Sequence, residues 1–216
     1  AVNINGLGDT GIQINFSGRE ISINNLKFAG ATSFARYGEP DIPSLNLFVG
    51  VPQEGGVELK IIEHQTETFY GVDIKPVSPL AIYEGSALED VEQLSIIYKT
   101  DRLYPENIVE IVGSGYFRDI NTVNLKINPV RYNPVKKELV ISRVLKIKVN
   151  FKGRPIIKPI VDNAFEEIYK RVIINYDQCK NWRRERFQQS IKNPFATGVW
   201  YKIEVDKKGL YKVGYD

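Results

Sequence analysis

Two stretches of alternating apolar and polar residues dominate the pattern of this chain, one at residues 123–127 and one at residues 145–151. Period-two alternation is typical of strands with one buried face. Between them, Pro134 fixes its own φ and disfavours helix at Asn133, which indicates a turn. The sequence therefore predicts a hairpin within residues 115–151, with its apolar face packed on another sheet. The positions expected to be buried are Val123, Leu125, Ile127, Leu145, Ile147, Val149 and Phe151.

Shorter alternating stretches predict further strands along the first two thirds of the chain. They lie at residues 12–16, 21–23, 45–49, 57–64 and 108–111, and the first two would form a hairpin around a turn at residues 17–20. The segment Gly113-Ser114-Gly115 is interpreted as a break between strands. Together the pattern predicts an all-β protein, an antiparallel β-sandwich spanning residues 1–160.

The strand pattern is interrupted for longest between Pro76 and Asp101, where prolines, Gly85 and acidic residues intervene. Connections longer than about 12 residues are uncommon within a compact domain, and they are usually functional or disordered. This segment is therefore predicted to be a long loop with a role of its own.

The periodicity changes after residue 160. Apolar residues from Phe165 to Cys179 recur with the spacing of one helix face, and Asn163 with Glu166 matches a capping box. The pattern predicts one helix over residues 163–180, with Cys179 packed at its end. Residues 161–192 are assigned to this helix and a basic linker, and residues 193–216 to a trailing β-hairpin of a following, incomplete domain.

Composition narrows the possible functions. The net charge is +3, but residues 1–100 carry 6 basic and 13 acidic side chains, whereas residues 101–216 carry 23 and 13. Such asymmetry also occurs in nucleic-acid-binding proteins, yet most of these basic residues alternate with apolar ones, as on a solvated sheet face, so nucleic-acid binding is not expected. No apolar run approaches the about 18 residues of a membrane helix, so no membrane insertion is expected.

The single histidine and the single cysteine do not suggest a catalytic pair. His64 ends a predicted strand and is expected at the surface, and Cys179 lies on a helix face. One cysteine excludes an internal disulfide and a cysteine-based zinc site. The chain also lacks a phosphate-binding glycine loop and a carboxylate cluster with metal spacing, so it is interpreted as non-catalytic, without a cofactor or metal.

Four further blocks of residues stand out along the chain. In order they are Gly38-Glu39-Pro40-Asp41-Ile42-Pro43; Tyr104-Pro105; Arg118-Asp119 continuing through Pro129-Val130-Arg131-Tyr132-Asn133-Pro134 to Leu139; and Phe165-Glu166-Glu167-Ile168-Tyr169-Lys170 followed by Asn175-Tyr176. These blocks resemble the propeptides of gingipain-type cysteine peptidases, which are secreted, caspase-like endopeptidases. Their common order and similar spacing, over residues 30–180, make the likeness more specific than any short motif.

The resemblance implies that the chain assists the folding of a cognate cysteine peptidase domain and blocks its active-site cleft. It places the anchor of the inhibitory loop between Pro76 and Tyr104, and the loop from Ser78 to Asp90 is predicted to be the inhibitory element. Tyr83 would be at the anchor position, with Ala81, Ile82 and Glu84 along the cleft. Family members with basic specificity have a basic anchor there, whereas no Lys or Arg occurs in residues 76–98 of this chain. The alternative interpretation is that Tyr83 packs on its own sandwich and the loop is a passive connector.

The resemblance also implies cleavage just after the Asn-Tyr block, where Lys180, Arg183, Arg184 and Arg186 supply four cations. The alternative is a solvated helix end stabilised by these cations at its C-terminal dipole. By family, the chain is expected to be secreted or at the cell surface. The absence of Met and the opening residues suggest that a signal peptide has been removed. A different class of function remains open, a non-inhibitory secreted β-sandwich module for adhesion or extracellular assembly.

Overall fold

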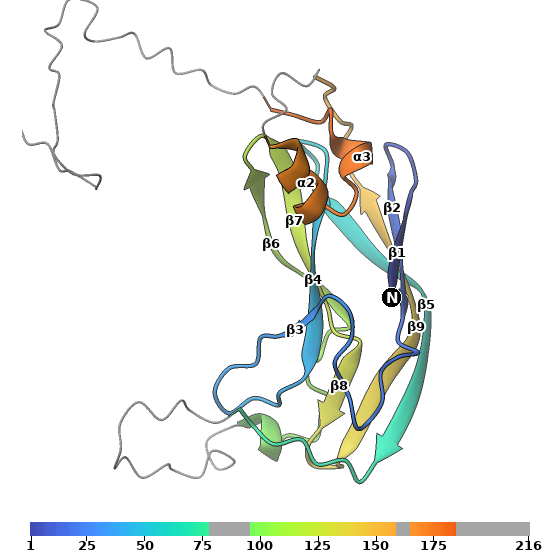
Figure 1. Cartoon of the computed structure of the whole chain (residues 1–216), viewed down its shortest axis with the longest axis vertical. Helices are drawn as coiled ribbons and strands as arrows, with labels where there is room; N and C mark the ends of the chain where they lie inside the picture. The colour runs from blue at the N-terminus through green and yellow to red at the C-terminus, as the bar shows by residue number, and fades with distance from the viewer. Residues whose placement is uncertain (78–95, 159–164, 185–216) are drawn as a thin grey trace, which may run out of the picture. The chain divides into compact units, whose positions relative to one another are not determined.

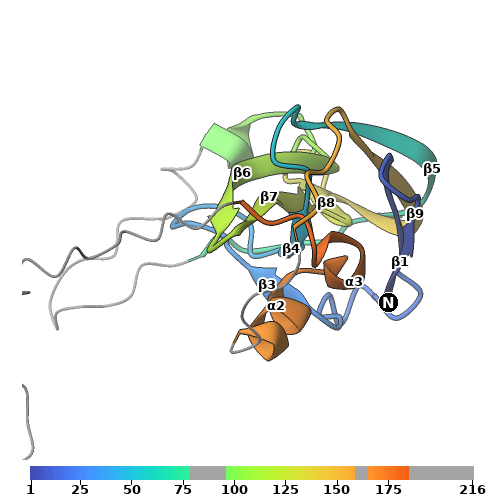
Figure 2. The same cartoon turned by 90° about the horizontal axis from the view of Figure 1, so that it is seen from above.

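This computed structural model describes residues 1–77, 96–158 and 165–184, which form two antiparallel sheets packed face to face (Figures 1 and 2). One sheet has the strand order β1-β2-β9-β5, with β8 also paired to β9, and the other has the order β3-β4-β7-β6. The predicted all-β sandwich is thus confirmed. The elements are β1 (Val2–Gly6), β2 (Gly11–Ser17), β3 (Ala31–Ser33), β4 (Pro43–Gly50), β5 (Val57–Tyr70), η1 (Ile96–Lys99), β6 (Val109–Phe117), β7 (Ile120–Ile127), β8 (Val130–Asn133), β9 (Glu138–Phe151), α2 (Glu166–Val172) and α3 (Tyr176–Cys179).

The core lies between the sheets and contains every position that the alternation assigned to it. Val123, Leu125 and Ile127 of β7 are at most 4% exposed, and the four apolar residues of β9 from Leu145 to Phe151 are at most 9% exposed. Residues Ile12, Ile14 and Phe16 of β2 complete the same layer. Burial of this apolar area is the main stabilising contribution to the sandwich.

The predicted hairpin between the two long alternating stretches is wrong. β7 pairs with β4 and β6 in one sheet, and β9 pairs with β2, β5 and β8 in the other, so the two strands face each other across the core. The hairpin that exists joins β8 to β9, and Asn133 Oδ1 closes its turn by accepting hydrogen bonds from the backbone N–H groups of Val135 and Lys136. Alternation identifies the buried face of a strand but not its hydrogen-bonded neighbour.

The N-terminal hairpin also differs from the prediction, because β2 pairs with β1 rather than with residues 21–23. The chain after β2 is held against β9 instead, where the Arg143 guanidinium donates to the carbonyl oxygens of Gly18 and Ile21, both at 2.6 Å. The predicted break at residues 113–115 is wrong as well. These residues lie inside β6, just after a register shift at Ile111.

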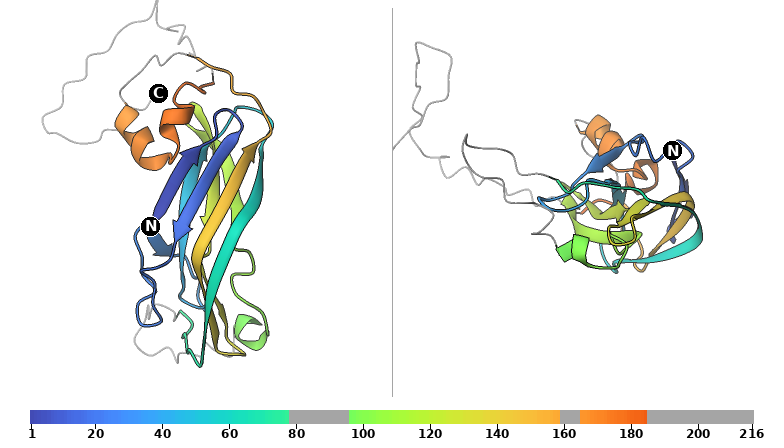
Figure 3. Two further views of the ribbon diagram at one scale, coloured as in Figure 1. Left: turned by 90° about the vertical axis from the view of Figure 1, so that its right-hand side faces the viewer. Right: turned by 90° about the horizontal axis from the view of Figure 1, so that it is seen from below.

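The single predicted helix is in fact two short helices at one end of the sandwich (Figure 3). Between them, Ile174 N donates to Phe48 O of β4 at 2.9 Å, and the Asn175 amide donates to Gly50 O at 2.9 Å and accepts from Gly50 N at 2.7 Å. These bonds to β4 replace the bonds that would continue the helix. Asn163 of the expected capping box lies outside the described residues, and the residue at the helix start is Phe165. In the part of the chain that the structure describes, no helix is long and apolar enough to span a membrane.

Candidate functional site

The predicted inhibitory residues Ala81, Ile82, Tyr83 and Glu84 lie outside the described residues, but both sides of their loop are described. On the entry side, Val77 pairs with the backbone of the Gly38-Glu39-Pro40 block. Val77 N donates to Glu39 O at 2.9 Å, and Gly38 N donates to Val77 O at 3.0 Å. Gly38 has φ +81°, a conformation that glycine adopts without strain. The first of the four family blocks, residues 38–43, thus holds the start of the loop by two backbone hydrogen bonds.

The exit side of the loop is tied to the same place through tyrosine hydroxyls. Tyr98, in η1, donates its hydroxyl hydrogen to Ile74 O at 2.7 Å. The buried Tyr132 hydroxyl donates to Val72 O at 3.0 Å and accepts from Ile74 N at 3.4 Å. The segments that precede and follow residues 78–95 therefore share one hydrogen-bonded base.

Two further family blocks meet at this base. Tyr104 and Tyr132 form a two-bond backbone bridge, with N···O distances of 2.8 and 2.7 Å. The side chain of Tyr104 hydrogen-bonds to Glu39, and burial followed by this carboxylate raises the pKa of Tyr104. We call the set of Glu39, Ile74, Tyr98, Tyr104 and Tyr132 the loop base. Its bonds join three of the four blocks that are far apart in the sequence.

Helices α2 and α3 lie at the opposite end of the sandwich from η1 (Figure 1). There a buried ion pair holds the C-terminal part of the described chain. Arg183 Nη1 lies 3.1 Å from Asp119 Oδ2, and both side chains are only 5% exposed. Asp119 Oδ1 also accepts from the Tyr169 hydroxyl at 2.5 Å, and Arg183 Nη2 donates to the Tyr176 hydroxyl at 2.8 Å. Burial disfavours the charge of Arg183, but the Asp119 carboxylate outweighs it and raises the pKa of the guanidinium.

Tyr169 and Tyr176 stack on each other with ring centroids 5.6 Å apart, and Tyr176 donates its hydroxyl hydrogen to Glu166 Oε2 at 2.5 Å. We call Asp119, Tyr169, Tyr176 and Arg183 the C-terminal anchor. The sequence indicates Asp119 only as part of a family block and Arg183 only as one of four cations after the Asn-Tyr block. No periodicity signals such a pair, because its members are 64 residues apart. The resemblance of Arg118-Asp119 to the family is the one feature of the sequence that singles out Asp119.

The four predicted processing residues have different environments. Lys180 directly follows α3 and is half-buried, Arg183 is buried in the anchor, and Arg184 is exposed and lies over the Tyr116 ring with its Cζ 4.3 Å from the ring centroid. Arg186 lies outside the described residues. Lys180, Arg183 and Arg184 therefore differ in exposure, although the sequence gives no reason to distinguish them.

The structure does not bring His64 and Cys179 together as a catalytic pair. His64 is in the middle of β5 rather than at a strand end, and it is half-buried, with Nε2 2.9 Å from Ser142 Oγ. Cys179 is fully buried and packs on Gly50 of β4, as expected for a packing role. Burial raises the pKa of this thiol to about 12, so it stays protonated at neutral pH. The described residues contain no cluster of three or more side chains suited to a metal ion.

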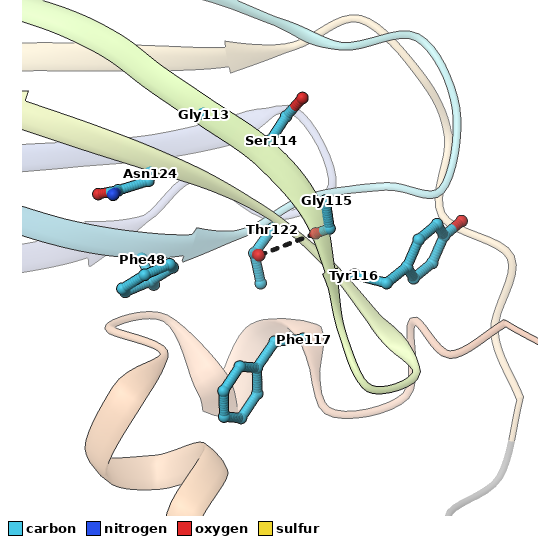
Figure 4. A pocket seen from close by; sticks show the side chains of 8 residues that line it. All are labelled: Phe48, Gly113, Ser114, Gly115, Tyr116, Phe117, Thr122 and Asn124. Atoms are coloured by element: carbon cyan, nitrogen blue, oxygen red, sulfur yellow. Dashed lines mark hydrogen bonds between the residues drawn. The ribbon is translucent and has the colours of Figure 1, made fainter.

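A hollow of about 290 Å³ lies on the outer face of the four-stranded sheet, next to β6 (Figure 4). Gly113 and Gly115 form one rim, and Phe48 and Phe117 lie on the other side, with Thr122 between them. The Thr122 hydroxyl donates to Gly115 O at 2.9 Å. Asn124 Oδ1 is buried and has no hydrogen-bond partner among the described residues.

Comparisons with known proteins agree on one family. The family model Propeptide_C25 matches residues 10–182. Gingipain R2 of Porphyromonas gingivalis is 22% identical over 163 residues, which cover 71% of this chain and 22% of that protein, and Lys-gingipain of the same organism is 20% identical over 164 residues, 68% of this chain and 10% of that protein. The chain therefore spans about a fifth or less of the length of these relatives.

Two solved structures share the fold. The first is the complex of Porphyromonas gingivalis RgpB pro- and mature domains, with a TM-score of 0.62 and 20% identity, covering 81% of this chain and 97% of the matched chain. The second concerns the zymogenic latency of gingipain K from the same organism, with a TM-score of 0.50 and 19% identity, covering 71% and 93%. These likenesses confirm the two-sheet fold.

Proposed function

Because this chain belongs to the Propeptide_C25 family, we propose that it is the propeptide of a gingipain-type cysteine endopeptidase, whose folding it assists and whose cleft it blocks. The observation that carries this proposal is the loop base, where three family blocks hold both sides of residues 78–95. The propeptide acts outside the cell after its signal peptide has been removed, because its relatives are gingipains.

Inhibition works by presentation of the loop on a rigid support. The loop base is fixed by backbone pairs and by three tyrosine hydroxyls, so little conformational entropy is lost there when the loop enters a cleft. An extended peptide held in this way resembles a substrate strand and gains main-chain hydrogen bonds on docking.

Tyr83 is the anchor that enters the specificity pocket, and Ala81, Ile82 and Glu84 lie along the cleft. A large amphipathic ring is the kind of side chain that dominates binding energy at interfaces. Since residues 76–98 contain no Lys or Arg, the cognate peptidase is one that does not require a basic residue at this position.

The experiment is titration of the cognate peptidase domain with the wild-type chain and with Tyr83→Ala. We expect the variant to inhibit about thirtyfold more weakly, equivalent to about 2 kcal/mol, with an unchanged melting temperature. The matched control is Tyr70→Ala, which removes a tyrosine that is 75% exposed at the end of β5, and it should inhibit like the wild type. Equal inhibition by all three proteins would place the anchor elsewhere, and failure of the wild type to inhibit would favour a non-inhibitory β module.

Processing is proposed within residues 180–186. Arg184, which is exposed, and Arg186 are the candidates for the residue before the cut bond, because Lys180 is half-buried and Arg183 is buried. A peptidase must bind the side chain before the cut bond, and the Arg183 guanidinium is bound to Asp119 in the protein interior. A precursor with Arg184→Gln and Arg186→Gln should remain uncleaved, as judged by mass spectrometry of the released fragment. A Lys180→Gln precursor should mature normally, and normal maturation of the double variant would disprove this assignment.

A further inference from the structure

Edge strands of this sandwich are protected in different ways, and β6 is the exception. An exposed edge carries free N–H and C=O groups that pair readily with another chain, so natural edges are short, charged or covered. β5 is charged, with Glu58, Lys60, Glu63 and Glu67, while β1 and β3 are short. The part of β4 beyond β3 is covered by Ile174 and Asn175.

β6 is not short and carries no charged residue over residues 111–117, whose sequence is IVGSGYF, and Arg184 lies over it at Tyr116. Ile111, Val112 and Tyr116 are 43%, 49% and 41% exposed. After the register shift at Ile111 the pairing with β7 is regular from Gly113 to Phe117, and in the described structure no strand pairs with the other side of β6. From Gly113 to Phe117 the edge is therefore uncharged and regularly paired, and the irregularity that can protect an edge strand lies before it, between Ile111 and Gly113.

The two glycines of this edge have no role in the fold that explains them. A Cβ on Gly113 or on Gly115 would meet no described atom within 4 Å, and neither glycine has a positive φ. By contrast, a Cβ on Gly11 or Gly18 would lie 2.1 or 2.2 Å from a carbonyl oxygen of β9. Glycine weakens a strand, and inside one it often marks a place where another backbone or a ligand approaches closely.

The hollow beside these glycines has the chemistry of a side-chain pocket. Gly113 and Phe48 flank Asn124 in one row across the sheet, so the missing side chain at Gly113 opens the space above Asn124. Phe48 is 37% exposed and offers an apolar wall. The unpartnered Asn124 Oδ1 lacks a hydrogen-bond donor among the described residues. A partner segment with an apolar side chain beside a backbone N–H or a hydroxyl would pack on Phe48 and donate a hydrogen bond to Asn124 Oδ1.

The position of Arg184 indicates which partner reaches this edge. Its backbone N–H donates to Asp119 O at 2.9 Å, and its guanidinium lies over Tyr116, so the described chain ends beside the end of β6. In a precursor, whatever follows is tethered within reach of this edge, which raises its effective concentration there. The relatives that are similar to this chain are much longer than it and are peptidases by name.

We propose that β6 is a docking edge for the cognate peptidase domain, which adds an extended segment along residues 111–117 and places an apolar side chain in the hollow between Gly113 and Phe48. This proposal rests on the proposed inhibitory function and adds a second contact, separate from the loop. Backbone pairing along an open edge is a common mode of peptide recognition.

The test compares Gly113→Lys and Gly115→Lys with the wild type for binding of the isolated peptidase domain. Each lysine fits the folded propeptide but places a charged side chain in the hollow and at the edge, so we expect at least tenfold weaker binding. The melting temperature should be unchanged or higher, because glycine is a poor strand former. The matched control is Thr66→Lys on the charged edge β5, which should bind like the wild type.

Each outcome has a separate meaning. Unchanged binding by both glycine variants, alongside weaker binding by Tyr83→Ala, would overturn the docking edge while leaving the inhibitory function intact. Absence of any binding by the wild type would count against the proposed function itself. Sedimentation of the free chain gives a third result: a dimer that Gly115→Lys dissociates would assign the edge to a second copy of this chain and overturn the proposal.

Discussion

Asp119→Asn should lower the free energy of unfolding of the propeptide by about 3–5 kcal/mol, the cost of removing one partner of a buried ion pair. The variant leaves the Arg183 guanidinium in the interior, 5% exposed, opposite a neutral amide. It also weakens the hydrogen bond that Asp119 accepts from Tyr169. Urea denaturation followed by tryptophan fluorescence measures the change, because Trp182 is buried next to the anchor residue Arg183.

Two variants separate burial from charge in this experiment. Asp73→Asn removes an exposed carboxylate that lies 3.8 Å from Lys137, and we expect almost no change in stability because exposed pairs contribute little. The double variant Asp119→Leu with Arg183→Met replaces both charges by apolar groups, and it should be markedly more stable than Asp119→Asn alone. If Asp119→Asn unfolds at the same urea concentration as Asp73→Asn, the anchor does not hold the C-terminal segment.

Most of the strands and their buried faces could be predicted because the alternation of residues such as Leu125 and Ile147 is a local property of the chain. The strand partners could not be predicted, because β7 and β9 present equivalent apolar faces to one core from opposite sides. The helix prediction failed for a related reason. The apolar spacing from Phe165 to Cys179 is helical throughout, but the hydrogen bonds that Ile174 and Asn175 make with β4 interrupt the helix.

The candidate site shows the same division between local and tertiary information. The sequence identifies the family blocks, but their physical meaning depends on contacts between them, such as Glu39 with Tyr104 and Asp119 with Tyr169. Three blocks meet at the loop base. At the other end of the sandwich, Tyr169 of the fourth block donates a hydrogen bond to Asp119, which begins the third block and forms the ion pair with Arg183. At Gly113 and Gly115 the sequence predicts a break rather than part of β6, because glycines interrupt the alternation of apolar and polar residues by which a strand is recognised.

The docking of α3 on β4 depends on Gly50, and Gly50→Ala should displace the helix. A Cβ at this position would lie 2.2 Å from Cys179 Sγ and 2.9 Å from Cys179 Cβ, closer than atoms in proteins approach. Movement of α3 would also break the two hydrogen bonds between Asn175 and the Gly50 backbone. Overpacking costs about 1–3 kcal/mol and the lost bonds about 1 kcal/mol, so we expect a loss of about 2–4 kcal/mol in unfolding free energy.

The chain reports this displacement through its own chemistry, because Cys179 is its single cysteine. In the wild type the thiol is fully buried and its pKa is raised to about 12, so it should react very slowly with a disulfide reagent at pH 8. In Gly50→Ala we expect rapid modification before global unfolding. Gly113→Ala is the matched control, since the same methyl group meets no described atom within 4 Å there, and its thiol should stay unreactive. Cys179→Ala added to Gly50→Ala removes the closest clashing atom and should restore part of the stability. No recovery in that double variant would show that the clash with Sγ is not what displaces the helix.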